Sequence, residues 1–400
     1  GTGDASPHFS YLGVMNLDID FTEAAVLEEA RRRTGLHDLG DDHFLVPLRI
    51  LLEGYRHLPA DQGAFKLMAW SSMVHLVQNR LRIHDALTRD PTVLERAVDR
   101  PVFVVGLPRT GTTFLHRLLA QAPDTRALRL YETLHPVPEG PDDPADRIQR
   151  TQLLTTLAHR LIPTLGQAHA LEPTAVEECF GLLLNTFVNP FMHPFSELGD
   201  GSYEAWLDRL ESDERDRAYR EYRQQLQLLS KDDTRRWVLK CPCHLFGLDA
   251  LLRVFPDAAV VHTHRSMVNA LPSLCSLVGM VYSMGSGSTP REEIGEVVSD
   301  LTEQLLHWSL RARKEEGAGR ILDVRFDDLV ESPVETVRKI HDRFGYDFDP
   351  ELQSRLEAHL DAREEGGRHD YSAEDFGLDR ERILERFAWY HERFGIATDA

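Results

Sequence analysis

Cysteine and long apolar segments are scarce in this 400-residue chain. The four cysteines, Cys179, Cys241, Cys243 and Cys275, have spacings that match neither a disulfide framework nor a CxxC pair. No segment approaches the uninterrupted apolar length that a membrane-spanning helix needs, and the first residues, GTGDASPHFSYLG, lack a basic stretch followed by an apolar one. The sequence therefore predicts reduced thiols and a cytoplasmic protein without a transmembrane segment.

Basic residues are also few relative to acidic ones. The chain has 65 aspartates and glutamates and 45 lysines and arginines, which gives a formal net charge of -20. Nucleic acids and polyanionic polysaccharides are bound by basic surfaces, so the charge balance argues against both as partners. A small acceptor that is neutral, lipid-like or cationic fits this composition better. The composition gives no indication of the oligomeric state.

The segment from Pro101 to Ala120, PVFVVGLPRTGTTFLHRLLA, predicts an apolar strand, a glycine-bounded loop and a helix. Gly106 and Gly111 have the spacing of an ATP-binding phosphate loop, but Thr112 stands where that loop carries its lysine. Glycines let successive backbone N–H groups converge on one anion, and the N-terminus of the following helix adds its dipole. Arg109 supplies a cation from another position in the loop. The pattern predicts a phosphate or sulfonate site that does not work in the ATPase manner.

Helical patterns dominate two long stretches of the chain. Residues 16–98 alternate apolar and charged positions at helical spacing, and similar patterns return through 146–230. We therefore expect a helical N-terminal region over 1–98, packed on an α/β domain over 99–400. A helical insertion that shapes the acceptor site is expected at about 127–230.

Three further apolar segments, each followed by a helical pattern, predict strands at Trp237–Lys240, Ala258–Thr263 and Ile321–Phe326. Alternation of strands and helices implies an α/β fold with a central parallel sheet flanked by helices. In open parallel sheets, ligands collect beyond the carboxyl ends of the strands. Polar residues follow these predicted strands, so we expect the functional site at this edge of the sheet.

Two of the predicted strand ends carry the most informative residues. One strand runs into Lys240-Cys-Pro-Cys-His244, which places a cation and an imidazole at the sheet edge. The other ends at Arg265, and Ser273 lies eight residues further on in a helix-like segment. An arginine and a serine can hold a second phosphate together.

These motifs, in this order, resemble those of sulfotransferases that use adenosine 3'-phosphate 5'-phosphosulfate (PAPS), in the broad bacterial branch of that superfamily. The resemblance covers most of the chain. The family's 5'-phosphosulfate loop is matched by Pro108, Arg109, Thr110, Gly111, Thr112, Thr113 and Phe114. Its 3'-phosphate pair is matched by Arg265 and Ser273, and its late aromatic element by Phe326-Asp-Asp-Leu329 ahead of Ser332-Pro333. The resemblance implies that Phe326 lies near the adenine.

The resemblance implies transfer of a sulfuryl group from PAPS to an acceptor hydroxyl or amine, with adenosine 3',5'-bisphosphate as the second product. Such a transfer needs stabilisation of the sulfuryl oxygens and of charge on the departing phosphate. Arg109, Lys240 and the threonine hydroxyls are expected to provide it. A sulfuryl group carries less negative charge than a phosphoryl group, so no metal is expected. His262 and His264 share a strand face, but the sequence places no further ligand near them.

Two residues are candidates for the base that activates the acceptor. His244 follows Lys240 much as a base histidine follows the matching lysine in cytosolic members of the family, although the interval is Lys-x-x-x-His rather than Lys-x-His. Glu178 belongs to the acidic pair Glu177-Glu178 in a helix-like segment, and some relatives use glutamate. We rank His244 slightly ahead of Glu178.

The acceptor is the least defined part of this interpretation. Phe187, Phe191, Met192 and Phe195 either form an apolar wall of its pocket or belong to the core. A hydroxylated lipid, polyketide or other secondary metabolite is the acceptor hypothesis that follows from those residues and from the acidic charge.

Two other functions stay open at this point. One is a kinase or NTPase that uses magnesium ATP, against which Thr112 argues. The other is a non-catalytic family member that only binds a nucleotide or a partner. The presence of Arg109, Lys240 and Arg265 together favours an active enzyme.

Overall fold

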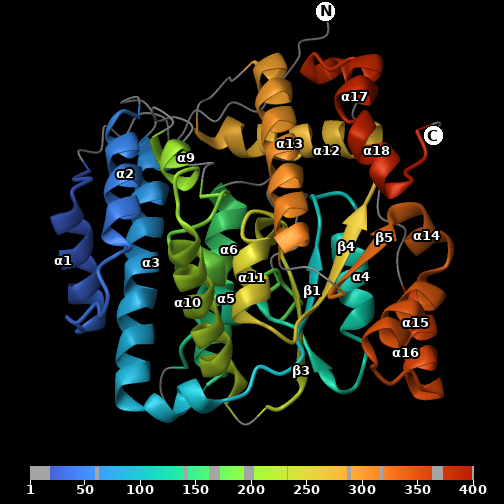
Figure 1. Ribbon diagram of the computed structural model, residues 1–400. Helices are drawn as coiled ribbons and strands as arrows, with labels where there is room; N and C mark the ends of the chain where they lie inside the picture. Colours follow the sequence, from blue (N-terminus) through green and yellow to red (C-terminus); the bar gives the residue numbers. More distant parts are fainter. Residues whose placement is uncertain are drawn as a thin grey trace, which may run out of the picture.

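A computed structural model of the chain describes residues 19–58, 63–138, 143–161, 172–192, 202–231, 233–285, 290–315, 319–362 and 373–398. Its centre is a five-stranded parallel sheet with the strand order β2-β3-β1-β4-β5 (Figure 1). The strands are β1 (Val102–Val105), β2 (Thr125–Arg126), β3 (Arg236–Lys240), β4 (Ala259–His264) and β5 (Ile321–Arg325). The sheet confirms the predicted α/β fold.

Helices make up most of the remaining described chain. They are α1 (Glu23–Thr34), α2 (Leu45–Arg56), α3 (Gly63–Arg89), η1 (Pro91–Glu95), α4 (Thr112–Leu119), α5 (Leu130–Leu134), α6 (Ala145–Leu161), α8 (Phe180–Leu184), α9 (Ser202–Leu207), α10 (Ser212–Ser230), η3 (Pro242–Leu245), α11 (Leu248–Val254), α12 (Met267–Gly285), α13 (Arg291–Glu315), α14 (Phe326–Glu331), α15 (Pro333–Phe344), α16 (Pro350–Asp361), η4 (Glu374–Phe376), α17 (Arg380–Arg386) and α18 (Ala388–Phe394). In Figure 1, α1–α3 lie at one side of the molecule and α14–α16 at the other.

Both faces of the central strand β1 are buried, which explains why this strand, VFVV, is apolar throughout. Side chains alternate between the faces along a strand. Val102 and Val104 pack with α4, α15 and α16 on one face. Phe103 and Val105 belong to a larger cluster on the other face, which also includes side chains of α10, α11 and α13. The parallel sheet is therefore covered by helices on both sides, as βαβ connections require.

The helices of the N-terminal region share the larger of these two clusters. Leu48 of α2 and Val77 of α3 are fully buried in the same apolar cluster as Phe103 of β1 and Tyr222 of α10. Buried apolar area is the main favourable term in folding, so this packing ties the N-terminal helices to the α/β core. The boundary at residue 98 stays a prediction.

The register of the sheet brings the informative strand ends to one edge. Val104 of β1 pairs with Lys240 of β3, and Val105 of β1 pairs with His262 of β4. At the other side of β4, His264 pairs with Arg325, after which α14 begins at Phe326. The loop after β1, the end of β3, the end of β4 and the start of α14 therefore meet at the carboxyl edge of the sheet.

Candidate active site

The loop between β1 and α4 depends on glycine at both of its ends. Gly106 has φ +149°, and a Cβ there would overlap the Thr263 hydroxyl and lie 2.9 Å from the Thr263 carbonyl oxygen. Gly111 has φ +90°, and its Cβ would lie 3.0 Å from the ring of Phe326. Residues with a side chain rarely adopt these φ angles, and neighbouring atoms already occupy the space that a Cβ would need. Substitution of either glycine would therefore displace the loop.

Thr110 of this loop and Thr263 of β4 stabilise the loop through their hydroxyl groups. Thr110 is fully buried, and its hydroxyl donates to the Leu107 carbonyl at 2.7 Å. The same hydroxyl lies 2.7 Å from the Thr263 hydroxyl on β4. The side chain of Thr110, which the sequence predicted to contact PAPS, therefore forms its hydrogen bonds within the protein. Thr112 is also buried, whereas Thr113 is exposed at the first turn of α4.

Three sequence motifs that lie far apart in the chain meet around Arg265. Its Nη1 donates to the Arg109 carbonyl at 2.9 Å, and its Cζ lies 4.0 Å from the Phe326 ring centroid. Phe326 also borders Gly111, as the glycine contact above shows. The structure thus brings together the loop, the end of β4 and the start of α14.

The charges of this cluster favour an anionic ligand. Burial lowers the pKa of Arg265, and the nearby positive charge of Arg109 lowers it further. Arg109 itself is exposed and has a left-handed backbone with φ +71°. A positive φ is uncommon for a residue with a side chain and costs free energy. Two arginines held close at the N-terminus of α4 make this part of the structure positively charged, and their role toward a phosphate or sulfonate stays a prediction.

The end of β3 builds a second cluster against the same helix. Lys240 follows the alternation that places Val238 on the α4 face, so its side chain reaches the start of α4. Its Nζ donates to the Thr113 hydroxyl at 3.1 Å and forms an ion pair with Glu178. Lys240 is 2% exposed, whereas the Glu178 side chain is 27% exposed. The carboxylate is thus partly open to a ligand, while the lysine is held behind it.

Glu178 lies in an extended segment, and the expectation of a helix at the Glu177-Glu178 pair is wrong. The Glu177 N–H donates to the Leu128 carbonyl, and the Cys179 N–H donates to the Lys240 carbonyl, both at 2.9 Å. These amides bond to distant segments instead of to a preceding helical turn, and α8 begins only at Phe180. The bond to Lys240 is what fixes Glu178 beside the end of β3.

His244 lies in the core, away from the open side of Glu178. It is fully buried on η3, with its ring edge-on to Phe103 at 5.2 Å between centroids. The Tyr219 hydroxyl lies 3.0 Å from His244 Nδ1. Burial lowers the pKa of His244 to about 3. An imidazole enclosed in this way has no access to an acceptor, so its placement counts against the role of base that we ranked first.

The model of the sulfotransferase family matches residues 101–350. That match spans more than half of the chain and includes the loop, both strand ends and the start of α14. The chain belongs to the sulfotransferase family.

Solved sulfotransferases have the same architecture. Sulfotransferase STF9 from Mycobacterium avium superposes with a TM-score of 0.83 at 25% identity, over 95% of this chain and 98% of that one. STF1 from Mycobacterium tuberculosis gives a TM-score of 0.77 at 29% identity, over 92% and 98% of the two chains. In sequence, omega-hydroxy-beta-dihydromenaquinone-9 sulfotransferase Stf3 from Mycobacterium bovis is 25% identical over 280 residues, which are 66% of this chain and 68% of the relative.

Two other predicted site residues of this sulfotransferase, Ser273 and Phe114, lie on α12 and α4. Ser273 is partly exposed on α12, which runs on through Pro272, and its role toward a 3'-phosphate stays a prediction. Phe114 is half-buried and packs on the α4 face of the sheet. None of the helices in the described ranges combines the length and apolar character that crossing a bilayer requires.

The expected apolar wall of the acceptor pocket belongs largely to the core. Phe187 is fully buried against Phe44, and Met192 is 2% exposed. Phe191 packs on the same cluster, and Phe195 lies outside the described residues. Sequence reasoning missed Phe180, which is 36% exposed two residues after Glu178. Its position two residues after the acidic pair is the only signal that the sequence gives.

A third potential metal ligand joins His262 and His264, which the sequence did not place there. Ligand atoms of these histidines and of Asp323 lie within 4.8 Å of one another. The guanidinium of Arg313, however, forms two hydrogen bonds with the Asp323 carboxylate at 2.6 and 2.7 Å, and also lies 3.2 Å from His262 Nδ1. The arginine supplies the positive charge that a cation would bring, so the cluster is a hydrogen-bonded network.

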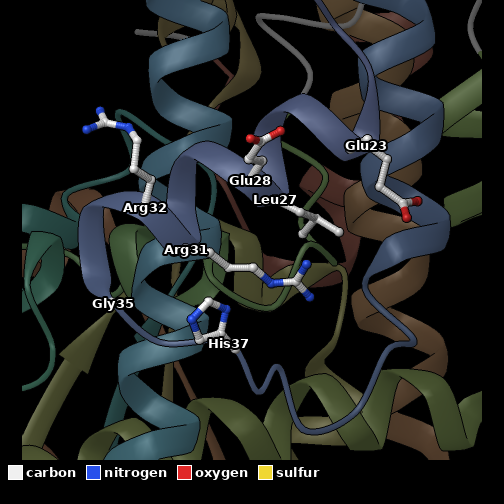
Figure 2. Close-up of a pocket in the computed structure, with 8 residues that line it drawn as sticks. Glu23, Leu27, Glu28, Arg31, Arg32, Gly35 and His37 are labelled. Atoms are coloured by element: carbon white, nitrogen blue, oxygen red, sulfur yellow. The ribbon is translucent and has the colours of Figure 1, made fainter.

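A wide surface hollow of about 750 Å³ lies on the N-terminal region (Figure 2). The described residues that line it come from α1 and the turn after it, among them Glu28, Arg31 and His37. None of these residues belongs to the loop or the strand ends at the carboxyl edge of the sheet. The hollow is therefore separate from the candidate active site.

Proposed function

We propose that this sulfotransferase uses PAPS as its donor and transfers the sulfuryl group to a hydroxyl of a small, apolar acceptor. The observation that carries the donor assignment is the meeting of Arg265, the Arg109 loop and Phe326 at the start of α4. A nucleotide with an aromatic base and phosphates at both its 3' and 5' positions matches this combination of charges and ring. Magnesium ATP lacks the 3'-phosphate. ATP-binding phosphate loops of other proteins hold it through a lysine, and Thr112 stands at that position in this chain.

In this proposal, different residues bind different parts of PAPS. The loop amides, Arg109 and Thr113 would bind the phosphosulfate, because they surround the N-terminus of α4. Arg265 would bind the 3'-phosphate together with Ser273, and Phe326 would pack on the adenine. Lys240, which reaches the Thr113 hydroxyl, would stabilise charge on the bridging oxygen as it departs.

Glu178 is the base that this arrangement favours. In the proposed step, the acceptor oxygen attacks sulfur in line, the bond from sulfur to the phosphate oxygen breaks, and Glu178 takes the acceptor proton. The products are a sulfate ester and adenosine 3',5'-bisphosphate. Glu178 is supported over His244 because its carboxylate is partly exposed beside Lys240 and Thr113, whereas the imidazole is enclosed in the core.

An apolar acceptor is supported by two observations. Phe180, the first residue of α8, is 36% exposed, so an apolar side chain is accessible two residues along the chain from the proposed base. The Mycobacterium bovis relative has an omega-hydroxylated dihydromenaquinone in its name. A hydroxylated lipid-like molecule is therefore the acceptor class that we assign. An acidic net charge leaves a cationic acceptor as the main competitor.

Calorimetric titration tests the donor. We expect adenosine 3',5'-bisphosphate to bind tightly without metal, and ADP to bind more weakly because it lacks the 3'-phosphate. A preference for ATP with magnesium would contradict the proposal and indicate phosphoryl transfer.

Turnover tests the acceptor. Radiolabelled PAPS would be incubated with long-chain and isoprenoid alcohols in one series and with cationic aminoglycosides in another. Sulfation confined to the alcohols supports the assignment. Sulfation confined to the aminoglycosides would exclude an apolar acceptor while leaving the donor assignment intact.

A further inference from the structure

The last helix of the described chain, α18, covers the end of β4 (Figure 1). The ring of Phe394 stacks on His264, with 3.7 Å between centroids and 17° between the planes. The Tyr390 hydroxyl lies 3.1 Å from His264 Nδ1. Because side chains alternate along a strand, His264 points to the α18 side, whereas Arg265 emerges on the side of the loop.

The same helix also binds a backbone amide just beyond Arg265. The backbone N–H of Met267 donates to His391 Nε2 at 3.0 Å. Tyr390 is 1% exposed and His391 is 4% exposed, so water does not compete for the bonds of these side chains. Arg265 is thus held from α18 through His264, which precedes it, and through Met267, two residues after it.

A chain of hydrogen bonds fixes the direction of the Tyr390 hydroxyl. Arg313 donates to Asp323, and His264 Nε2 donates to the same carboxylate at 2.9 Å. With its proton on Nε2, the neutral imidazole offers Nδ1 as an acceptor, and burial lowers the pKa of His264, which favours the neutral form. Tyr390 therefore donates to His264, and this bond fixes the residue that directly precedes Arg265.

The guanidinium of Arg265 is held from the opposite side. It donates to the Arg109 carbonyl and lies over the Phe326 ring. Its backbone is positioned by α18 and its side chain by the loop and α14. A rotation of the β4 end would move the guanidinium relative to both of these partners.

We propose that Tyr390 and His391 are positioning residues that hold Arg265 for the 3'-phosphate, so that α18 sets the preference for 3'-phosphorylated nucleotides. This proposal rests on the proposed donor. Neither residue contacts the nucleotide in this scheme. They act through the His264 side chain and the Met267 amide, which distinguishes them from the arginine itself.

The test compares two ligands that differ only in the 3'-phosphate, adenosine 3',5'-bisphosphate and AMP. Calorimetry gives the Kd of each for the full chain, and the ratio of the two Kd values measures the preference. In Tyr390→Phe, which keeps the ring and loses the hydroxyl, we expect this ratio to fall roughly fivefold to tenfold, because one buried hydrogen bond is lost. The Kd of AMP should stay unchanged.

Two further variants separate positioning from general destabilisation. Tyr203→Phe removes another hydroxyl that is 1% exposed and donates to the Phe187 carbonyl at 3.0 Å, and the ratio should stay at the wild-type value. His391→Leu should lower the ratio, whereas His391→Gln, which keeps an acceptor for the Met267 amide, should restore most of it. Circular dichroism confirms folding of each variant before titration.

The outcomes distinguish the two proposals. A wild-type protein without any preference for the 3'-phosphate would overturn the donor assignment. A wild-type preference that Tyr390→Phe and His391→Leu both retain would overturn the role of α18 alone. Equal weakening of both ligands in these variants would also overturn it, because a merely structural helix would affect both ligands alike.

Discussion

Strands β3 and β4 flank β1 on opposite sides, and each ends in a cation with a histidine nearby. At β3, Lys240 is buried behind Glu178, and His244 packs into the aromatic core with no link to that ion pair. At β4, Arg265 faces the loop, and His264 is bonded to α18, which also binds the Met267 amide. Both histidines are fully buried.

The difference separates two kinds of strand end. The end of β3 places a carboxylate, a lysine and a hydroxyl together, which is an arrangement for chemistry on a bound group. The end of β4 places an arginine between an aromatic ring and a carbonyl, which is an arrangement for binding. Substitutions in the cluster at the end of β3 should therefore lower kcat. Substitutions in the cluster at the end of β4 should raise the Kd of the nucleotide.

Among these substitutions, Glu178→Gln, at the end of β3, should have the largest effect, and that effect should be on kcat. Loss of a general base lowers kcat by about 100-fold to 10,000-fold, while the Kd of adenosine 3',5'-bisphosphate should change little. Stopped assays with radiolabelled PAPS give kcat, and calorimetry gives the Kd. The neighbouring Glu177→Gln is the matched control and should keep most of the activity. A Glu178→Gln enzyme with wild-type kcat would remove Glu178 from the mechanism.

Arg265→Ala should have the next largest effect, and on the other side of the comparison. Loss of a charged contact to the 3'-phosphate should weaken binding of adenosine 3',5'-bisphosphate by about 10-fold to 100-fold. With saturating donor, kcat should fall much less. The exposed Arg343→Ala on α15 controls for the loss of one positive charge. Equal Kd values for Arg265→Ala and the wild type would contradict the binding role of the β4 end.

His244→Asn should change how stability depends on pH. The unfolded chain protonates this histidine near pH 6.5, whereas the folded protein resists protonation down to about pH 3. The free energy of unfolding of the wild type therefore falls as the pH drops from 6.5 toward 3, by about 1.4 kcal/mol per pH unit from this group. Urea unfolding at pH 6.5 and 4.5 should show a shallower loss in His244→Asn.

Tyr219→Phe is the control for that slope. It removes the hydroxyl partner of His244 but leaves the imidazole, so the loss of stability on acidification should persist. Equal slopes for His244→Asn and the wild type would show that the folded protein admits the proton.

His244→Asn should have the smallest effect on catalysis. Because the side chain is enclosed, we expect kcat within about threefold of the wild type at neutral pH, whereas loss of a true base costs at least about 100-fold. Initial rates at saturating donor measure this directly. A large drop in kcat in a stably folded variant would return His244 to the role of base.

Local patterns predicted the strands well, because each contains a short run of apolar residues that pack in the parallel sheet. Three strands were predicted at Trp237–Lys240, Ala258–Thr263 and Ile321–Phe326 and observed at Arg236–Lys240, Ala259–His264 and Ile321–Arg325. The two-residue strand β2 escaped prediction because it is too short to show a pattern. The helix expected at Glu178 was wrong because its amides bond to residues distant in sequence.

The sequence by itself determined the loop between β1 and α4, since its glycines and Arg109 are local features of one strand, loop and helix. It also determined the parallel sheet and the order in which Lys240, Arg265 and Phe326 follow their strands. Only the tertiary structure decided that Glu178 lies beside Lys240, that His244 is enclosed in the core, and that α18 packs on His264 at the end of β4. The physical reason is that each of these depends on which sheet face a side chain takes and which distant segment covers that face.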